Sequence, residues 1–246
     1  MESAFRKLDR ILKSQPFDDI SDMTINPVAY ARGMAEVENV VAVVSDLSRS
    51  TSRIFAGGFA GRLGLDGYDE EDSIWEKRIL SLMPEEELTE KFVAELRFLH
   101  FVRRQPPTRR GRYYLESRLR FREKDGEMVD VLHRMYYVYD AVSGAVRYAV
   151  CIYGPLTFGL AARSVVVDSL TGVTEELTPA DDGRILSSRE KQVLSLINKG
   201  KTSQEIADEL NISRHTVSRH RQEILARLQV RNSVEACRLA RSMSII

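Results

Sequence analysis

Hydrophobic residues recur at helical spacing in the last quarter of the chain, in four short segments. Each segment follows a side chain that can cap the free N–H groups of a helix, namely Ser187, Thr202, Ser213 and Asn232. After three of these caps a glutamate follows three residues later, at the spacing of a capping box. Gly200 suits the left-handed conformation that ends a helix. The pattern predicts four short amphipathic helices.

The second and third of these helices are separated only by residues 211–213, the tight connection of a helix-turn-helix. When Val217 is placed at the centre of the buried stripe, steps of about 100° per residue define the opposite face of the third helix. That face carries His215, Arg219 and Gln222, with Ser218 on its flank. We therefore expect an outward face that is polar and rich in hydrogen-bond donors.

The earlier part of the chain contains both helical patterns and patterns typical of strands. A helical stretch runs to Lys13, and Pro16 and Pro27 are expected to break it into an arm. The β-branched run Val40–Val44 predicts a central strand, and Arg53–Ala56 a second one. Helices are predicted at Phe59–Leu63, Ser73–Met83 and Glu86–Val102.

The pattern then changes to alternation with a period of two, which is typical of half-buried strands. Three such strands are predicted at Tyr113–Phe121, Val129–Tyr139 and Val146–Tyr153, joined by hairpin turns. A further small hairpin, Ser164–Val167 with Val173–Leu177, is expected between the two domains. Residues 178–183 resemble an exposed acidic linker.

Composition is consistent with a two-domain globular protein. The chain has 246 residues, of which 43% are hydrophobic, so it can bury one large core and a small second one. No apolar run approaches the roughly 20 residues that span a bilayer, and the charged N-terminus is unlike a signal peptide. We therefore expect a cytoplasmic protein without a membrane partner. Cys151 and Cys237 lie in apolar patterns, which favours core thiols over a disulfide or a metal site.

Charge is distributed unevenly, although the net charge is zero. From Arg184 onward there are twelve Lys and Arg against six Asp and Glu, a net charge of +6. The preceding 183 residues hold 24 basic and 30 acidic residues, a net charge of −6. A basic module on an acidic body favours contact with phosphate, although a solvated basic face would give the same count.

Residues 186 to 241 resemble the LuxR-type helix-turn-helix. The matching positions are Leu186, Ser187, Arg189, Glu190, Val193, Leu194, Gly200, Glu205, Ile206, Ala207, Leu210, Ile212, Ser213, Thr216, Val217, His220, Leu228, Val230, Arg231, Asn232, Glu235 and Ala236. The resemblance implies a bacterial transcription regulator that binds double-stranded DNA as a homodimer. It also implies that the third helix, about residues 213–228, enters the major groove.

The resemblance assigns base contacts to Ser218, Arg219 and Gln222, in agreement with the helical wheel. It further implies that the fourth helix pairs two subunits, with an interface formed by Val234, Cys237, Arg238 and Arg241. Arginine suits guanine and glutamine suits adenine, because each side chain can make two hydrogen bonds to the edge of that base.

Phosphate contacts are expected where the two helices of the motif begin. Free N–H groups and the helix dipole favour an anion at such a terminus. The candidates are Lys201, Thr202, Ser203, Gln204, Arg214, His215 and Thr216. Arg221 lies near the edge of the buried stripe, which leaves a structural role and a phosphate contact open.

The order of strands, helices and three closing strands resembles a PAS-like sensor domain over roughly residues 35 to 156. Residues 82–86, Leu-Met-Pro-Glu-Glu, stand where many PAS domains have a His-Pro-Asp-Asp stretch, and Met83 replaces the usual His. This resemblance implies a pocket for a small-molecule ligand or a protein partner. Candidate pocket residues are Trp75, His133, Tyr137 and Cys151, although the sequence favours an ordinary core role for each of them. No cofactor is expected.

Other classes fit the sequence less well. A phosphorylatable receiver needs repeated strand-helix units around clustered acids, and Asp46 has no acidic neighbour. The acyl-homoserine lactone pocket of quorum sensors has several Trp residues, whereas this chain has one. An enzyme is not expected, because no nucleophile motif, phosphate loop or metal spacing is present. A protein-interaction adaptor would need apolar anchors on the outward face of the third helix.

The sequence therefore predicts an α+β protein with an antiparallel-sheet sensor domain and an all-α four-helix DNA-binding domain. The expected organisation is a helical arm at 1–34, the PAS-like domain at 35–160, a hairpin and linker at 161–183 and the helix-turn-helix domain at 184–246.

Overall fold

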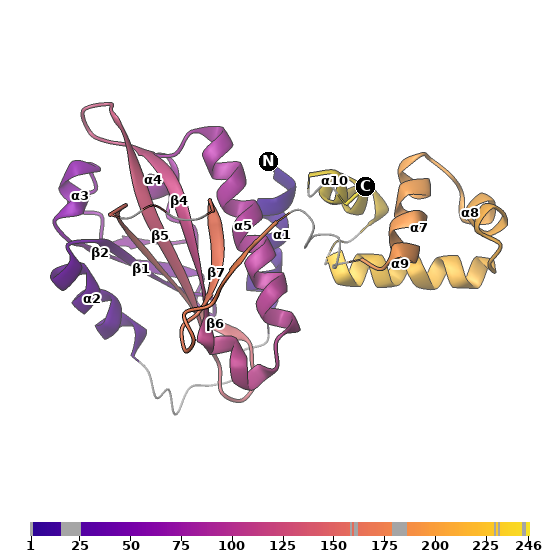
Figure 1. The fold of residues 1–246 in the computed structure, drawn as a ribbon, viewed down its shortest axis with the longest axis horizontal. Helices are drawn as coiled ribbons and strands as arrows, with labels where there is room; N and C mark the ends of the chain where they lie inside the picture. The colour runs from indigo at the N-terminus through magenta and orange to yellow at the C-terminus, as the bar shows by residue number, and fades with distance from the viewer. Residues whose placement is uncertain are drawn as a thin grey trace. The chain divides into compact units, whose positions relative to one another are not determined.

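A computed structural model of the chain contains a body built on a β-sheet and a group of C-terminal helices (Figure 1). It describes residues 2–15, 26–157, 159, 162–178, 186–228, 230, 232–242 and 245–246. One compact unit contains residues 12–177, and the other combines residues 1–11 with residues 178–246. Within the described ranges, no helix has the length and apolar character needed to cross a membrane.

The larger unit is built on one antiparallel sheet with the strand order β3-β2-β1-β6-β5-β4-β7-β8. Its strands are β1 (Val41–Asp46), β2 (Thr51–Ala56), β3 (Glu70–Glu71), β4 (Tyr113–Arg122), β5 (Met128–Tyr139), β6 (Val146–Pro155), β7 (Ser164–Asp168) and β8 (Thr174–Glu176). The helices of the N-terminal half are α1 (Glu2–Lys13), α2 (Pro27–Glu38), α3 (Phe59–Arg62), α4 (Lys77–Leu80) and α5 (Glu85–Arg104), followed by the 3₁₀ helix η1 (Pro107–Arg112). The expected order of strands, helices and a closing three-stranded meander is confirmed.

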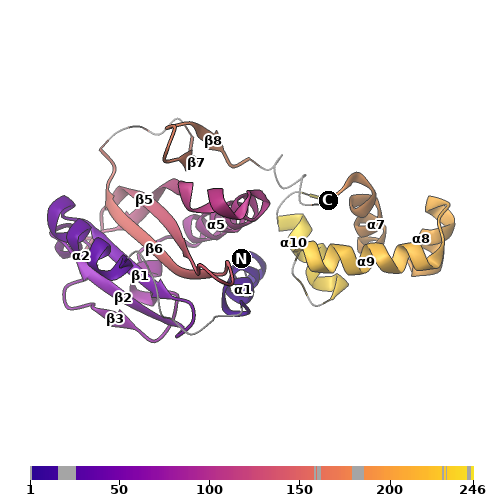
Figure 2. The same ribbon diagram turned by 90° about the horizontal axis from the view of Figure 1, so that it is seen from below.

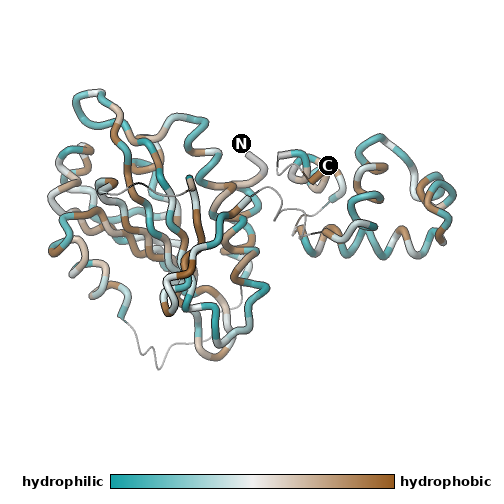
Figure 3. The backbone as a smooth tube through the Cα atoms, in the orientation of Figure 1, coloured by the Kyte–Doolittle hydropathy of each residue, from teal (hydrophilic) through white to brown (hydrophobic). Residues whose placement is uncertain are grey.

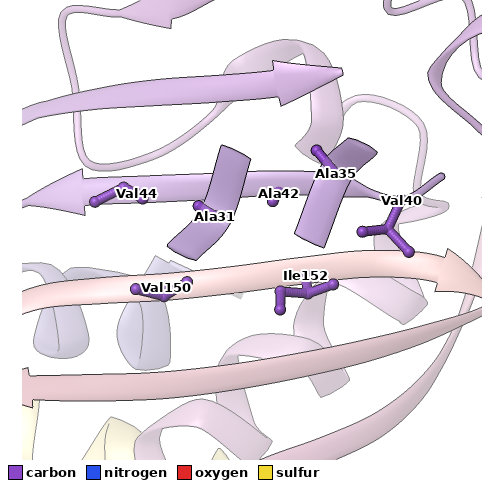
Figure 4. Packing of buried hydrophobic residues seen from close by; sticks show 7 residues of the cluster. All are labelled: Ala31, Ala35, Val40, Ala42, Val44, Val150 and Ile152. Carbon is purple, nitrogen blue, oxygen red and sulfur yellow. The ribbon is translucent and has the colours of Figure 1, made fainter. Parts of the chain in front are cut away.

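The two faces of the sheet are covered by different helices. Small and β-branched side chains of β1 and β6 pack against α2, and Figure 4 shows this cluster of Ala31, Ala35, Val40, Ala42, Val44, Val150 and Ile152. In Figure 2, α2 lies over β1 and β2, away from α5. Because side chains alternate along a strand, the remaining residues of β1 and β6 face α5.

Gly57 permits this close packing of α2 on the sheet. A Cβ atom at Gly57 would lie 2.2 Å from the carbonyl oxygen of Ala35 and 2.5 Å from that of Val40. Both contacts are to backbone, so no side chain could move aside to accommodate the added atom. Glycine is therefore required where α2 passes the end of β2.

The interpretation of Pro27 as a residue that breaks a helix was wrong. Pro27 is the first residue of α2, and the side chain of Asn26 accepts a hydrogen bond from the backbone N–H of Ala29. Proline is tolerated at this position because its missing N–H would have had no partner within the helix. The neighbouring break expected at Pro16 lies outside the described residues.

The helix predicted over residues 73–83 is also wrong for most of its length, since only α4 is helical there. Ile74 and Trp75 precede α4 and are buried, and Trp75 packs edge-on against Phe92 with ring centroids 5.5 Å apart. The side-chain hydroxyl of Ser73 accepts a hydrogen bond from the backbone N–H of Trp75. The apolar residues of this segment are spaced as in a helix, although they are buried in an irregular conformation.

The small hairpin expected between the domains instead widens the sheet. Strand β7 pairs with β4, with Tyr113 opposite Asp168 and Ser117 opposite Ser164, and β8 pairs with β7. The hydroxyl of Ser164 donates a hydrogen bond to that of Ser117 over 3.0 Å. This hairpin therefore belongs to the unit that contains the sheet. Residues 179–183 of the expected linker lie outside the described residues.

The C-terminal unit contains the four predicted helices. They are α7 (Ser188–Asn198), α8 (Ser203–Leu210), α9 (Arg214–Leu228) and α10 (Ser233–Ser242). Figure 3 shows hydrophobic and hydrophilic residues alternating along these helices, as expected of short amphipathic helices around a small core. The predicted α+β class, with an antiparallel sheet followed by a four-helix domain, is confirmed.

Candidate nucleic-acid interface and buried polar cluster

The predicted caps begin the helices of the C-terminal domain. Ser187 and Thr202 each form a complete capping box with the glutamate three residues later. The backbone N–H of Thr216 donates to the hydroxyl of Ser213 over 3.0 Å, and that of Glu235 donates to the side chain of Asn232 over 2.9 Å. These caps fix where each helix starts.

The turn between α8 and α9 is short and locally determined. Asn211 has φ 51°, the left-handed conformation that ends α8, and the backbone N–H of Ile212 donates to the carbonyl of Ala207 over 3.0 Å. Asparagine adopts this conformation more readily than most residues. The turn and the cap at Ser213 together set the angle at which α9 leaves α8.

A small core holds α9 in place. All four helices contribute buried apolar side chains to it, among them Val193, Leu194, Ile206, Val217, Ile224, Leu228, Ala236 and Ala240. Contacts join α7, α8 and α10 to α9. Because the apolar stripe of α9 is buried against three helices, its opposite face must point to solvent.

The predicted base-contacting residues lie on that solvent face. Ser218, Arg219 and Gln222 are all exposed. The guanidinium Nε of Arg219 lies 3.6 Å from a carboxylate oxygen of Glu223, and the Arg219 side chain retains 63% of its surface. An exposed ion pair of this kind contributes little energy, so the guanidinium can exchange it for another acceptor.

The predicted phosphate contacts divide into exposed and engaged residues. Lys201, Gln204, Arg214 and His215 are exposed at the starts of α8 and α9. The hydroxyls of the other three residues, Thr202, Ser203 and Thr216, already make hydrogen bonds within the domain. Those of Thr202 and Thr216 take part in the helix caps, and that of Ser203 accepts a hydrogen bond from Arg221 over 3.0 Å.

Several links between helices were not expected from the sequence. The bond from Arg221 to Ser203 supports the structural role for Arg221. The guanidinium of Arg189 donates to the carbonyl of Leu210 over 2.6 Å, which joins α7 to the end of α8. Arg227 of α9 lies 3.1 Å from Glu190 of α7, whose side chain is 1% exposed. A glutamate on the buried stripe of α7 was the available signal for this contact.

The predicted dimer-interface residues of α10 face two directions. Val234 is 63% exposed, and Arg238 and Arg241 are exposed as well. Cys237 is only 6% exposed, and its Sγ lies 3.9 Å from the carbonyl oxygen of Leu194 in the same domain. The thiol of Cys237 is therefore part of the domain's own core.

The four residues predicted for a sensor pocket lie in the larger unit, and all are buried. Trp75, His133, Tyr137 and Cys151 retain between 0% and 9% of their surface. His133 stacks on Tyr153 with ring centroids 4.7 Å apart. Tyr137 stacks on Phe98 of α5 at 5.3 Å. These side chains thus line the interior between the sheet and α5.

The structure adds charged residues to this interior, which we call the buried polar cluster: Glu76, Lys91, Glu95, His133, Tyr137, Cys151 and Tyr153. Lys91 and Glu95 form an ion pair at 2.5 Å within α5. A carboxylate oxygen of Glu95 lies 4.0 Å from Nε2 of His133, and Glu76 accepts a hydrogen bond from the hydroxyl of Ser45 over 3.1 Å. The sequence signal was a Lys and a Glu four residues apart on the apolar side of a helix.

Burial controls protonation in the cluster. It lowers the pKa of His133 well below its usual value, and the positive charge of Lys91 lowers it further. Burial raises the pKa of Glu76, and it raises those of Cys151, Tyr137 and Tyr153 strongly. Burial also opposes the charge on Lys91, but the attraction of Glu95 outweighs it and raises the pKa of Lys91. His133 is therefore neutral, and it lies beside the ion pair of Lys91 and Glu95, whose charges offset each other.

Part of the buried polar cluster has unused hydrogen-bonding capacity. Among the described residues, both ring nitrogens of His133 and the hydroxyls of Tyr137 and Tyr153 are buried without a hydrogen-bond partner. Unsatisfied buried polar atoms are costly. No group of His, Cys, Asp and Glu able to hold a metal ion occurs in the described ranges.

The fold and the exposed face of α9 define a helix-turn-helix domain. Residues 184–240 match the family model described as "Bacterial regulatory proteins, luxR family". The C-terminal domain therefore belongs to the LuxR family of helix-turn-helix domains, and the resemblance stated from the sequence is confirmed for this part of the chain.

Two curated relatives match this chain over 60 and 51 residues. The uncharacterized response regulatory protein YgeK of Escherichia coli (strain K12) is 42% identical over 60 residues, which cover 24% of this chain and 41% of YgeK. The transcriptional regulatory protein DesR of Bacillus subtilis (strain 168) is 47% identical over 51 residues, 21% of this chain and 26% of DesR. The chain thus spans less than half the length of these relatives.

Solved structures of two regulators align over most of the chain at low similarity. A Vibrio cholerae VqmA dimer without its target DNA is 15% identical, covers 87% of this chain and 86% of VqmA, and has a TM-score of 0.33. Escherichia coli SdiA is 14% identical, covers 100% of this chain and 93% of SdiA, and has a TM-score of 0.26. TM-scores this low do not establish a shared fold.

Proposed function

We propose that this protein is a sequence-specific DNA-binding transcription regulator whose α9 helix enters the major groove. The observation that carries the proposal is the polarity of α9. Val217 and Ile224 are buried at 0% and 1% exposure, while Ser218, Arg219 and Gln222 on the other side are exposed. A short connection to α8 presents this face outward, as in helix-turn-helix proteins that bind DNA.

The exposed side chains supply the chemistry that DNA recognition needs. Arg219 can donate two hydrogen bonds to guanine, and Gln222 can both donate to and accept from adenine. The exposed Lys201, Gln204, Arg214 and His215 would contact phosphates, which would set the register without selecting a sequence. The net charge of +6 on the C-terminal segment favours both kinds of contact.

Two copies are expected to act together. Val234 is a large apolar side chain left exposed on α10, and Arg238 and Arg241 lie exposed on the same helix. A symmetric pairing through α10 would bury Val234 against its counterpart and present two α9 helices to one face of the duplex. The half-sites should then be centred about one helical turn apart, roughly 10 base pairs.

The larger unit is proposed to act as a sensor that controls how the α9 helices are presented. The unsatisfied atoms of His133, Tyr137 and Tyr153 support this role, because a small molecule that completes their hydrogen bonds would stabilise one conformation of the unit. Trp75 and Cys151 belong to the same interior. A protein partner that favours one conformation would act in the same way.

Selection of binding sites from random DNA with the intact protein tests the main proposal. The expected result is an inverted repeat, with affinity that falls steeply as salt increases, because counterions are released from the contacted phosphates. Recovery of no common sequence, together with salt-independent attraction, would contradict DNA recognition and favour a protein-interaction adaptor.

A further inference from the structure

A second group of polar side chains lies in the larger unit, where α5 ends and η1 begins. Arg103 is in the last turn of α5, Arg110 is in η1, and Tyr137 and Tyr139 are at the end of β5. The 3₁₀ helix η1 contacts both α5 and β5. The segment from 103 to 112 holds five arginines.

These four side chains share one neighbourhood. The charge of Arg103 interacts with both Tyr137 and Tyr139, and the charge of Arg110 interacts with Tyr139. The two tyrosine rings lie 6.4 Å apart, nearly perpendicular to each other. Burial lowers the pKa of Arg103, and although the tyrosines oppose this change, the nearby Arg110 adds to it. The charge of Arg110 thus disfavours the charged form of Arg103.

All four groups are hydrogen-bond donors, and within the described ranges the two tyrosine hydroxyls lack an acceptor. The hydroxyls of Tyr137 and Tyr139 are buried without a hydrogen-bond partner, and Tyr137 is 5% exposed overall. The Arg103 side chain is half-buried beside them. Hydroxyls buried without an acceptor are costly.

Acceptors in or next to these segments are already used. Arg110 donates to the carbonyls of Gln105 and Arg103 over 3.2 Å and 3.3 Å, which covers the negative end of α5. Asp140, just after β5, accepts from the backbone N–H groups of Val142 and Ser143. Asp168 is paired with Arg112 at 2.6 Å.

We propose that Arg103, Arg110, Tyr137 and Tyr139 form a binding site for a small anion, the carboxylate or phosphate group of a ligand. Such a group carries several lone pairs in a plane or tetrahedron that match the donor fork of arginine. It would accept from Arg103 and from both hydroxyls, and its negative charge would offset the effect of Arg110 on Arg103. Tyr137 also belongs to the buried polar cluster.

Titration calorimetry with the intact protein tests the site. The probes are inorganic phosphate and succinate, in an amine buffer with sodium chloride holding the ionic strength constant. The expected result is saturable binding of at least one probe, which also shows whether the site prefers phosphate or carboxylate. Arg103→Gln is expected to weaken binding about tenfold or more, because it removes charge-assisted hydrogen bonds.

Arg104→Gln is the matched control, since Arg104 is the next residue, is exposed and loses the same charge. It should leave the affinity within about twofold of the parent. Tyr139→Phe removes only a hydroxyl and provides a second test if Arg103→Gln unfolds, with an expected several-fold loss. Absence of saturable binding, or equal losses in Arg103→Gln and Arg104→Gln, would overturn the proposal.

The DNA-binding surface also attracts phosphate, so it needs its own control. Lys201→Ala should leave the anion affinity unchanged, and Arg103→Gln should leave binding to DNA without added anion unchanged. Loss of anion binding in Lys201→Ala would assign it to the DNA-binding surface and overturn the site at α5. The anion site and the proposed regulator function can thus fail independently.

Discussion

Arg219 and Lys201 illustrate two different contributions to DNA binding at the scale of single residues. Both are exposed, but Arg219 lies on the outer face of α9, whereas Lys201 precedes α8. A side chain that faces base edges affects the choice of sequence, and one that faces phosphate affects affinity for all sequences.

Replacing Arg219 by Ala is expected to weaken binding to the selected site by about 1–3 kcal/mol and to leave binding to random DNA nearly unchanged. Lys201→Ala should weaken binding to both and reduce the slope of log affinity against log salt by about 1. Fluorescence anisotropy with labelled duplexes measures both effects. If the two variants lose equally on both kinds of DNA, the assignment of roles is wrong.

His133 makes the stability of the larger unit depend on pH. Its pKa in the folded protein is lowered well below 6.5 by burial and by Lys91, and Glu95 and Tyr153 are its other ionisable neighbours. The unfolded chain therefore binds a proton near pH 6.5 that the folded chain does not. Stability from this residue is complete at higher pH and is lost as the pH falls below that value.

Between about pH 7.5 and about pH 5.5 the loss attributable to His133 should be about 1.4 kcal/mol. His133→Gln should remove this part of the pH dependence, whereas His215→Gln, at an exposed position on α9, should not. Urea unfolding followed by the fluorescence of Trp75, the chain's single tryptophan, reports on this unit. An unchanged pH slope in His133→Gln would contradict the buried neutral histidine.

At the scale of elements, the contact between α7 and α9 depends on one buried carboxylate. Glu190 accepts hydrogen bonds from the backbone N–H and the hydroxyl of Ser187 and also lies beside Arg227 of α9. One side chain thus caps α7 and links it to α9. Its loss would remove both the cap at Ser187 and the link to α9, while loss of the half-exposed Arg227 would remove only the link.

Glu190→Ala is expected to destabilise the C-terminal domain by about 1–3 kcal/mol. Arg227→Gln, which breaks the same ion pair from its exposed side, should cost less than about 1 kcal/mol. Urea unfolding followed by far-ultraviolet circular dichroism gives both values. Equal costs in the two variants would show that the pair itself, and not the cap, stabilises the domain.

At the scale of the whole molecule, the proposed pairing of two copies through α10 predicts a difference between full and half sites. Val234→Asp should reduce affinity for the complete inverted repeat by tenfold or more, about 1.4 kcal/mol, because it places a charge in a symmetric apolar contact. Affinity for an isolated half-site should stay the same.

Val142→Asp is the matched control for this experiment, because Val142 is 84% exposed and lies in the turn between β5 and β6. It should affect neither full-site nor half-site affinity. Sedimentation velocity of the protein with each duplex measures the stoichiometry directly. Two copies of Val234→Asp bound to the full repeat with unchanged affinity would exclude α10 as the dimer contact.

The features that could be predicted are those encoded within a few neighbouring residues. The caps at Ser187, Thr202, Ser213 and Asn232 and the turn at residues 211–213 depend on contacts only two to five positions apart. The outer face of α9 follows from the same local periodicity. For this reason the C-terminal domain and the alternating strands of the sheet were identified without coordinates.

Tertiary structure decided the features that depend on distant partners. Strand β7 joins the sheet only because β4, more than forty residues earlier, offers a free edge to it. Residues 73–76 form an irregular segment that is held in the interior, because Trp75 packs against Phe92 and Glu76 accepts a hydrogen bond from Ser45. The surroundings of Arg103 and His133 likewise arise where α5 meets β5 and β6. Such contacts leave no regular spacing in the chain, since the energy that selects them is the burial of surfaces brought together by the complete fold.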